Sequence, residues 1–595
     1  MSFYNIRNEK GISKKRAAFS SAGDELYSAQ IVDANIGAVL DEGAIVMNME
    51  KDGACLVTRK GARIILDAGE ADAFCFDAGK YVFKQGTQLF ICDVETEELT
   101  CVRNDLPMDE RCVIYHLYGF FAAFCEGGAV YTVSDTAPFE SEESSLYLPI
   151  VYKLTADKQE KKEDINFLTE YCRIYAMVGM GNKCELPKDL LLDPDFYEVE
   201  TTAGMELSND AISFDVNEDG GATIWGRSLN SNLYITVRLK HDENGVFKQR
   251  EEIDRAKALF FSNEGSFTFS GTNEGRANIV CYGGSAEKYL GVFSIDKKFY
   301  VPPKDVLLYE NTERITSVLR YSDDHLVFSP HYIRRMVLSE DENGEKRFSV
   351  DMENFKYDVG CDIPQSAVCA DDKIIYANSA AGVFYIDRFG FSQRDMSRNV
   401  SANIERGTHG LFAFDKAELE SAQAVICAGK YYLCVGGIFY IWDFLRGVPS
   451  SGTEKISESR KMYWTLASNL FCKKILGSDI NKFYFITEND EICVFGEDTD
   501  AENVESFFKS ESVSVSRFGK ACVFKLSLAA YCAQDATVRC YFDGKESSAK
   551  YTLAPSKEQT TIYEILPEKR SCKSFAFSIS SNGKMRIEGA EVKWY

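Results

Sequence analysis

The sequence predicts an all-β fold, namely a β-propeller of about six or seven blades with an inserted β-rich domain and a C-terminal β-sandwich. Three observations support this prediction. Aromatic residues make up 13% of the 595 residues, and aromatic side chains favour strands. A strand–turn–strand unit recurs along the chain. Near residue 505 the composition changes to alternating strands that are joined by tight turns.

The repeated unit is clearest in GKYVFKQGTQLFICD (79–93) and GKYYLCVGGIFYIWD (429–443), which align without a gap. Both segments begin with Gly-Lys-Tyr, carry glycine at the eighth position and close on aspartate. A single hairpin is barely stable in water, so repeated hairpins must pack on one another. Looser copies with spacing typical of propeller blades lie at 119–135, 325–338, 371–387 and 481–495. A set of β-sandwiches is the alternative architecture, but copies 350 residues apart still align, which favours a propeller.

The dipeptide Trp442-Asp443 resembles the end of a WD40 blade. A WD40 array would repeat Trp-Asp and carry Gly-His upstream, and this chain does neither. In the aligned copies the aspartate recurs and the tryptophan does not. We therefore interpret the aspartate as the residue that ends a strand and caps a turn.

Four regions are predicted along the chain. Residues 1–138 form N-terminal propeller blades, and residues 139–205 form an inserted domain that is rich in charge and proline. Residues 206–504 form the remaining blades. Residues 505–595 form the C-terminal β-sandwich, in which Asp543-Gly544 and Asn582-Gly583 predict hairpin turns.

The net charge of −24 argues against a protein that grips nucleic acid through its phosphates. Residues 506–595 hold 14 Lys and Arg against 9 Asp and Glu, a net of +5, so the first 505 residues carry −29. The 19 cysteines form no C-x-x-C pair and are interpreted as small buried hydrophobes in a reducing cytosol. The start has no signal-peptide pattern, and no run approaches the ~18 apolar residues of a membrane helix. We expect no membrane insertion.

The sharpest chemical motif is DVNEDG (215–220), in which Asp215, Asn217 and Asp219 have the spacing that begins a calcium loop. Gly226 stands where such a loop needs a glutamate, so a polar turn is favoured. Calcium is the one candidate cofactor.

No catalytic or other cofactor-binding residue is predicted. The sequence holds five histidines and lacks H-E-x-x-H, G-x-S-x-G and phosphate-loop signatures. We therefore expect that the protein is not an enzyme. Acidic residues are abundant, so a paired-carboxylate glycosidase site stays open as an alternative.

Four segments together resemble a family of virion proteins of tailed bacteriophages, common in phages and prophages of Firmicutes. In the first, 48–66, an asparagine and an acidic stretch precede Thr58, Arg59 and Gly61. The second, 146–169, carries a Tyr-x-Pro and Asn-x-Leu-Thr pattern in Tyr147, Pro149, Asn166, Leu168 and Thr169. The third is 420–444 with 462–475, and the fourth is 569–595. The family usually has proline after Thr-Arg, where this chain has Lys60.

The resemblance implies a structural component of the virion at the neck or tail, as a head–tail connector, nozzle or hub. Several copies would form a ring around a DNA channel, assembled in the bacterial cytoplasm. The implied partners are other copies, portal, adaptor or tail proteins, and passing DNA that is bound without sequence specificity. An acidic body would repel DNA and let it slide. The alternatives are a receptor- or carbohydrate-binding, glycosidase-like tail propeller, and a cytosolic interaction scaffold.

Overall fold

The structure is a computed structural model. It describes residues 6–7, 13–15, 26–30, 38–40, 43–67, 69–108, 112–117, 119–125, 129–144, 149–155, 158–163, 172–178, 183–186, 197–203, 212–216, 222–226, 233–239, 256–261, 267–271, 278–283, 306–309, 316–321, 324–340, 346–351, 359–370, 373–387, 398–445, 462–497, 504–516, 519–557, 559–568 and 570–595. Nearly all of the regular secondary structure in these residues is strand, which confirms the all-β prediction. Within them, no helix has both the length and the apolar character needed to cross a membrane.

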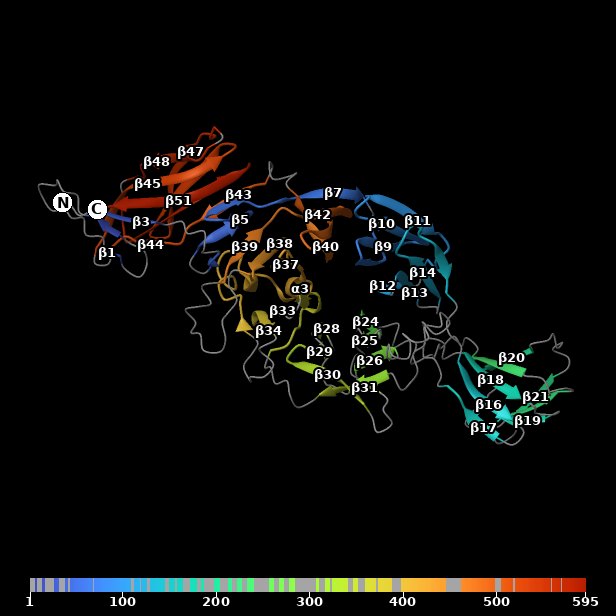
Figure 1. Ribbon diagram of the computed structural model, residues 1–595. Coiled ribbons are helices and arrows are strands. Elements are labelled where there is room, and N and C mark those ends of the chain that lie inside the picture. The colour runs from blue at the N-terminus through green and yellow to red at the C-terminus, as the bar shows by residue number, and fades with distance from the viewer. Residues whose placement is uncertain are drawn as a thin grey trace, which may run out of the picture.

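In the described part of the chain, six antiparallel sheets of four strands and one four-stranded segment of a ten-stranded sheet follow one another (Figure 1). We count this segment as the sixth of seven sheets. They are β8 (Ala73–Asp77), β9 (Lys80–Gln85), β10 (Gln88–Asp93) and β11 (Glu98–Arg103); β12 (Cys112–Leu117), β13 (Phe120–Cys125), β14 (Val130–Ser134) and β15 (Ser141–Glu143); β24 (Ala256–Phe261), β25 (Phe267–Gly271), β26 (Asn278–Gly283) and β27 (Val306–Tyr309); β28 (Ser317–Tyr321), β29 (Asp324–Phe328), β30 (Ile333–Glu340) and β31 (Lys346–Asp351); β32 (Val368–Ala370), β33 (Lys373–Asn378), β34 (Gly382–Asp387) and β35 (Arg398–Asn399); β36 (Gln423–Cys427), β37 (Lys430–Val435), β38 (Ile438–Asp443) and β39 (Trp464–Ala467); and β40 (Cys472–Ser478), β41 (Phe483–Thr487), β42 (Glu491–Glu497) and β7 (Gly61–Asp67).

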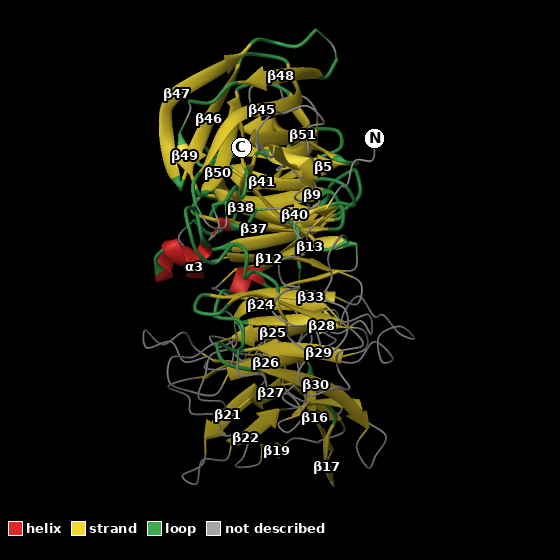
Figure 2. Ribbon diagram, turned by 90° about the vertical axis from the view of Figure 1, so that its left-hand side faces the viewer, coloured by secondary structure: helices red, strands yellow, loops and turns green. Residues whose placement is uncertain are grey.

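The sheets are arranged about a common centre in Figure 1, and Figure 2 shows them stacked edge-on. First strands of neighbouring sheets contact each other in several pairs, namely β8 with β12, β28 with β32, and β36 with β40. β40 of the last sheet also contacts β8 of the first sheet. A buried core that includes Tyr81 and Phe83 of the first sheet and Tyr484 and Ile486 of the last fills this junction. The succession of sheets therefore returns to its start.

The last sheet is completed by a strand from the N-terminal part of the chain. β7 pairs antiparallel with β42, with Arg63 opposite Val494 and Ala62 opposite Phe495. The predicted hairpin at 481–495 is thus β41 and β42, two strands of a sheet in which β7 lies more than 400 residues earlier in the sequence. Because a strand's local pattern does not identify its partner, the sequence contained no signal for this pairing.

The hairpin pairing explains the repeated Gly-Lys-Tyr and closing aspartate. Lys80 lies opposite Asp93 and pairs with it at 2.9 Å, and Lys430 lies opposite Asp443 in the matching copy. The residue before each opening lysine is a glycine with positive φ, 69° at Gly79 and 71° in the second copy, as a tight two-residue hairpin turn requires. The pattern is therefore a hairpin signature.

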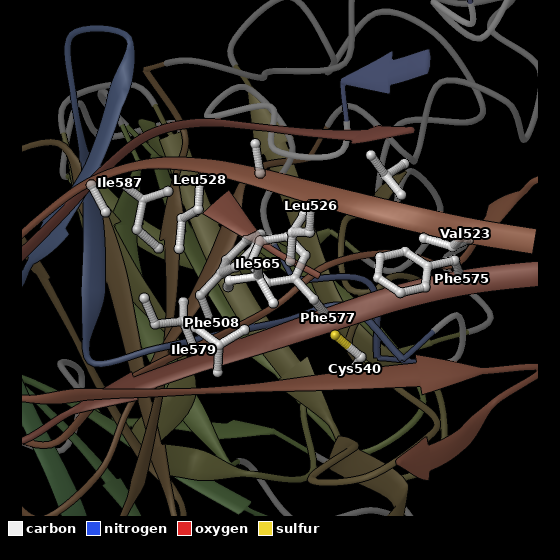
Figure 3. Close-up of a cluster of buried hydrophobic side chains, with 14 of the residues drawn as sticks. Phe508, Val523, Leu526, Leu528, Cys540, Ile565, Phe575, Phe577, Ile579 and Ile587 are labelled. Carbon is white, nitrogen blue, oxygen red and sulfur yellow. The ribbon is translucent and has the colours of Figure 1, made fainter. Parts of the chain in front are cut away.

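The C-terminal sandwich has two sheets with a buried core between them, part of which Figure 3 shows. One sheet runs β3 (Leu26–Gln30), β51 (Met585–Trp594), β45 (Ala521–Cys532) and β48 (Thr561–Ile565); it also includes β1 (Ile6–Arg7), β2 (Ser13–Lys15), β5 (Met49–Asp52), β6 (Cys55–Thr58) and β49 (Ser571–Cys572). The other runs β43 (Ser506–Lys509), β50 (Ser574–Ser581), β46 (Ala536–Phe542) and β47 (Lys545–Leu553), with β44 (Val513–Ser514) beside β50. β4 (Ile45–Met47) joins this second sheet to β39.

The predicted limits of the first region need correction. Residues 1–138 were expected to form only blades, yet β3, β5 and β6 belong to the sandwich. Leu56 is fully buried in the core of the sandwich, beside side chains from the other end of the chain. The alternating pattern of these strands predicted β structure correctly and gave no indication of their distant partner.

The inserted domain is also longer than the predicted 139–205. Its strands are β16 (Ile150–Thr155), β17 (Lys158–Lys161), β18 (Cys172–Val178), β20 (Tyr197–Ala203) and β23 (Leu233–Leu239) in one sheet, and β19 (Lys183–Leu186), β21 (Ile212–Val216) and β22 (Ala222–Gly226) in another. Residues 212–239 had been assigned to a blade, because their hairpin pattern is the same as a blade's. Conversely, β15 is the fourth strand of the second sheet.

Candidate functional site

A buried arginine, Arg59, directly follows β6. Its side chain is only 4% exposed. Nε donates to Asn48 Oδ1 at 2.9 Å, Nη1 to the Lys60 carbonyl at 2.7 Å and Nη2 to the Ser468 carbonyl at 3.0 Å. The guanidinium also lies over the ring of Phe495, 5.7 Å from its centroid. One buried cation therefore joins the β5–β6 hairpin to the sixth and seventh sheets.

Asn48 extends this network to the sandwich. Its Nδ2 donates to Ser468 Oγ at 3.1 Å and to the Glu505 carbonyl at 2.8 Å, and its Oδ1 accepts from the Ser468 amide at 2.9 Å. Its φ of 55° lies in the left-handed region, which asparagine tolerates better than most residues. Asn48 thus contacts the sixth sheet and the residue that precedes β43.

Thr58 attaches the hairpin directly to the sandwich. Its hydroxyl accepts from the Met585 amide at 2.8 Å and lies 2.8 Å from Ser506 Oγ. On the neighbouring strand, Glu50 pairs with Lys430 of the sixth sheet at 2.6 Å. We call Asn48, Glu50, Thr58 and Arg59 the joint. All four lie in 48–66, the segment that carries the Thr-Arg-x-Gly pattern.

A hollow of about 450 Å³ opens beside the joint, where β5, β6, β45 and β51 run side by side. We call it the junction pocket; its lining residues are Glu50, Lys51, Asp52, Val57, Thr58, Arg59, Lys60, Tyr531, Lys584, Met585 and Arg586. The lining comes from two segments more than 470 residues apart in the sequence. Sequence reasoning missed the contribution of Tyr531, Lys584 and Arg586, for which no local pattern exists.

A histidine links the first two sheets. His116 Nδ1 lies 3.1 Å from Asp77 Oδ2, and its Nε2 lies 3.1 Å from Asp135 Oδ2. Both ring nitrogens face carboxylates, so the arrangement favours the doubly protonated ring. The hydrogen bond to Asp77 is the main cause that raises the pKa of His116, and the same bond lowers the pKa of Asp77. The cluster therefore joins the first two sheets most strongly when His116 is protonated.

The residues predicted to bind calcium are only partly described. Asp215 lies in β21, opposite Thr223 of β22. Asn217 and Asp219 lie outside the described residues, as do Tyr147, Asn166, Leu168 and Thr169 of the inserted-domain pattern. Among the residues that the structure describes, no group of three or more His, Cys, Asp or Glu side chains could hold a metal ion.

The cysteines of the described ranges are mostly buried and none forms a disulfide. Burial raises the pKa of Cys75, Cys361 and Cys540 to about 12. A thiol with so high a pKa stays protonated near neutral pH and is a poor nucleophile. The interpretation of these cysteines as small core side chains agrees with their burial.

Trp442 has a structural position. It is fully buried, stacks on Trp464 with ring centroids 6.0 Å apart and meets Tyr385 edge-on at 5.6 Å. These contacts lie in the core between the fifth and sixth sheets. The Trp-Asp dipeptide is therefore one core side chain followed by the recurring aspartate.

No family model matches the chain, and no curated protein matches it. Similar solved structures include the computationally designed Ika8 protein, with 11% identity, a TM-score of 0.30 and coverage of 76% of this chain and 100% of that one. A mitotic checkpoint complex chain has 5% identity, a TM-score of 0.33 and coverage of 75% and 93%. BamB from Moraxella catarrhalis has 10% identity, a TM-score of 0.31 and coverage of 74% and 99%. Because these TM-scores are below 0.5, the likenesses carry no argument about function.

Proposed function

We propose that the seven four-stranded sheets are the blades of a β-propeller, and that the chain is a structural component of a tailed-phage virion. It would stand at the neck or tail, as a head–tail connector, nozzle or hub, and form a ring of copies around the DNA channel. One observation carries the proposal. The first segment of the family resemblance, 48–66, supplies both the joint and most of β7, which completes the last sheet.

This observation matters because it gives the resemblance a physical basis. A short Thr-Arg-x-Gly pattern is weak evidence when it stands alone. Here Thr58 and Arg59 bind three parts of the molecule together, and Gly61 begins β7. The segment therefore stabilises a propeller-and-sandwich architecture of the kind that the resemblance implies, and its residues have a structural role.

The charge distribution supports the same function. The first 505 residues carry −29, and a surface of that sign repels DNA phosphates. A ring of such subunits would let DNA pass without holding it. The sandwich, with +5 over residues 506–595, has the opposite sign and suits contacts with acidic neighbours such as other copies, portal, adaptor or tail proteins.

The test is to purify particles of the phage or prophage that encodes the chain and quantify the protein by mass spectrometry. We expect a fixed copy number relative to the portal protein, and gold-labelled antibodies at the neck or tail. Purified protein imaged by electron microscopy should form rings of one size. Absence from purified particles would refute the proposal. Glycan binding by a protein that is present at the tail tip would favour the receptor-binding alternative.

A further inference from the structure

The junction pocket carries the opposite charge to the chain that contains it. Its lining holds five cationic side chains and two acidic ones, a formal net charge of +3: Lys51, Arg59, Lys60, Lys584 and Arg586 against Glu50 and Asp52. The whole chain carries −24. A basic hollow in an acidic protein concentrates anions locally, because the walls of a hollow focus the field of the charges that line it.

Much of this positive charge is not neutralised within the pocket. Glu50 is paired with Lys430, which lies outside the lining, at 2.6 Å. Three hydrogen bonds of the Arg59 guanidinium go to neutral acceptors, namely an amide oxygen and two backbone carbonyls. In the part of the chain that the structure describes, the exposed Lys60 and Lys584 form no ion pair. These two ammonium groups are therefore available to a ligand.

Arg586 lies in the middle of the pocket. Cross-strand pairing places Tyr531, Arg586, Val57 and Glu50 in one row across β45, β51, β6 and β5. The guanidinium has one intramolecular ion pair, to Glu588 at 3.4 Å, and donates from Nη2 to Cys55 Sγ at 3.4 Å. The ion pair is long and a thiol sulfur is a weak acceptor, so a better acceptor could replace both. Tyr531 and Val57 are half-buried and add apolar surface to either side.

We propose that the junction pocket binds a small polyanion that carries two or more carboxylate or phosphate groups. The planar fork of Arg586 would hold one such group with two parallel hydrogen bonds. Lys60 and Lys584 would hold a second group as point charges. The volume of about 450 Å³ is in the range of small-molecule sites. The inference rests on the pocket alone and is independent of the virion proposal.

The test uses the full chain and isothermal titration calorimetry with inorganic pyrophosphate and with citrate. We expect saturable binding at one site per chain, with an affinity that falls between about 0.01 M and about 0.15 M ionic strength as ion pairs are screened. The double variant K584A/R586A should weaken binding by about tenfold or more, the factor that corresponds to 1.4 kcal/mol.

The matched control is K545A/K550A, which removes the same two charges from exposed positions of β47 in the other sheet of the sandwich. It should bind both probes as the unaltered protein does. Because all four side chains are exposed, each variant should keep the thermal midpoint of the unaltered protein. Binding of only one probe would identify phosphate or carboxylate as the preferred group. The proposal is overturned if neither probe shows saturable binding up to about 10 mM, or if both double variants weaken binding equally.

Discussion

Arg59 gives the sharpest prediction about stability, because its hydrogen bond to the Ser468 carbonyl joins residues that are 409 positions apart in the sequence. A second bond holds Asn48, which itself contacts Ser468. The change Arg59→Ala removes donors at 2.9, 2.7 and 3.0 Å from a side chain that is 4% exposed. It leaves Asn48 Oδ1 with one donor, the Ser468 amide, and leaves the carbonyls of Lys60 and Ser468 to find water. We expect the joint to open far more readily.

The magnitude follows from two opposing terms. Hydrogen bonds from a charged donor are worth about 1.5–3 kcal/mol each, which sums to about 4.5–9 kcal/mol for three. Removing the guanidinium also removes the cost of burying a cation, which is several kcal/mol. The expected net loss is about 3–5 kcal/mol, because neutral acceptors that lose their donor cost about 1–3 kcal/mol each.

Hydrogen exchange followed by mass spectrometry is the suitable assay, because it measures local opening in a chain of several domains that need not unfold in one step. Peptides that contain Asn48 and Ser468 should exchange about 10²–10³ times faster in R59A, since each 1.4 kcal/mol is a factor of ten. R59K should fall between, because lysine keeps the charge and loses the fork.

The matched control is Arg63→Ala, four residues further along the chain. Arg63 pairs with Glu97 at 2.6 Å, but both side chains are more than a third exposed, so the expected loss is about 1 kcal/mol or less. If exchange at the joint in R59A stays within threefold of that in R63A, the assignment of Arg59 as the main connection is wrong.

Two further predictions concern the ring of sheets. The pKa of His116 is raised above 6.5, so its contacts with Asp77 and Asp135 stabilise the folded state fully below pH 6.5. This stabilisation is lost as pH rises through the raised pKa. The lowered pKa of Asp77 adds stability above pH 3.8, which is lost as the carboxylate is protonated in acid. The thermal midpoint of the unaltered protein should therefore fall as pH rises above 6.5, and that of H116Q should change less. The contact contributes about 1 kcal/mol or less, because the Asp77 side chain is largely exposed. Equal pH dependence in the two proteins would contradict this role of His116. Trp464→Phe should lower the midpoint more than Trp442→Phe, because only Trp464 donates its indole N–H to a backbone carbonyl, at 2.7 Å; equal midpoints would show that this bond contributes nothing.

The sequence was sufficient for features that are encoded locally. The repeated Lys and Asp of 79–93 face each other across a hairpin. The C-terminal part of the sandwich begins at β43, close to the predicted residue 505. The burial of the cysteines is also a local property, because they stand within apolar strands. Period-two alternation and turn residues record which segments are strands and which side of each is buried.

Such patterns do not identify which strands pair with one another. β6 reads as an ordinary strand, and nothing in its own residues indicates that β51, near the other end of the chain, is its neighbour. The predicted range of the inserted domain is too short for the same reason, because the pattern of the β21–β22 hairpin is equally typical of a blade. The junction pocket depends entirely on such pairings. Its cationic residues are unremarkable surface positions until β6 and β51 lie together.

The long-range pairings also constrain how the molecule reaches its final state. β7 pairs with β42 to complete the last sheet, and β6 pairs with β51 to complete the sandwich. Both pairings join residues near position 60 to residues synthesised late, so neither can form until most of the chain exists. Non-local strand pairing of this kind is slow, since loop-closure entropy is lost before the contacts form. The joint lies between the two pairings. Arg59 binds the Ser468 carbonyl and Thr58 binds the Met585 amide, so the joint connects the two regions. Because the pocket is lined from both segments, its anion affinity would appear only in chains that have completed the sandwich, which makes ligand binding a measure of complete folding as well as of the site.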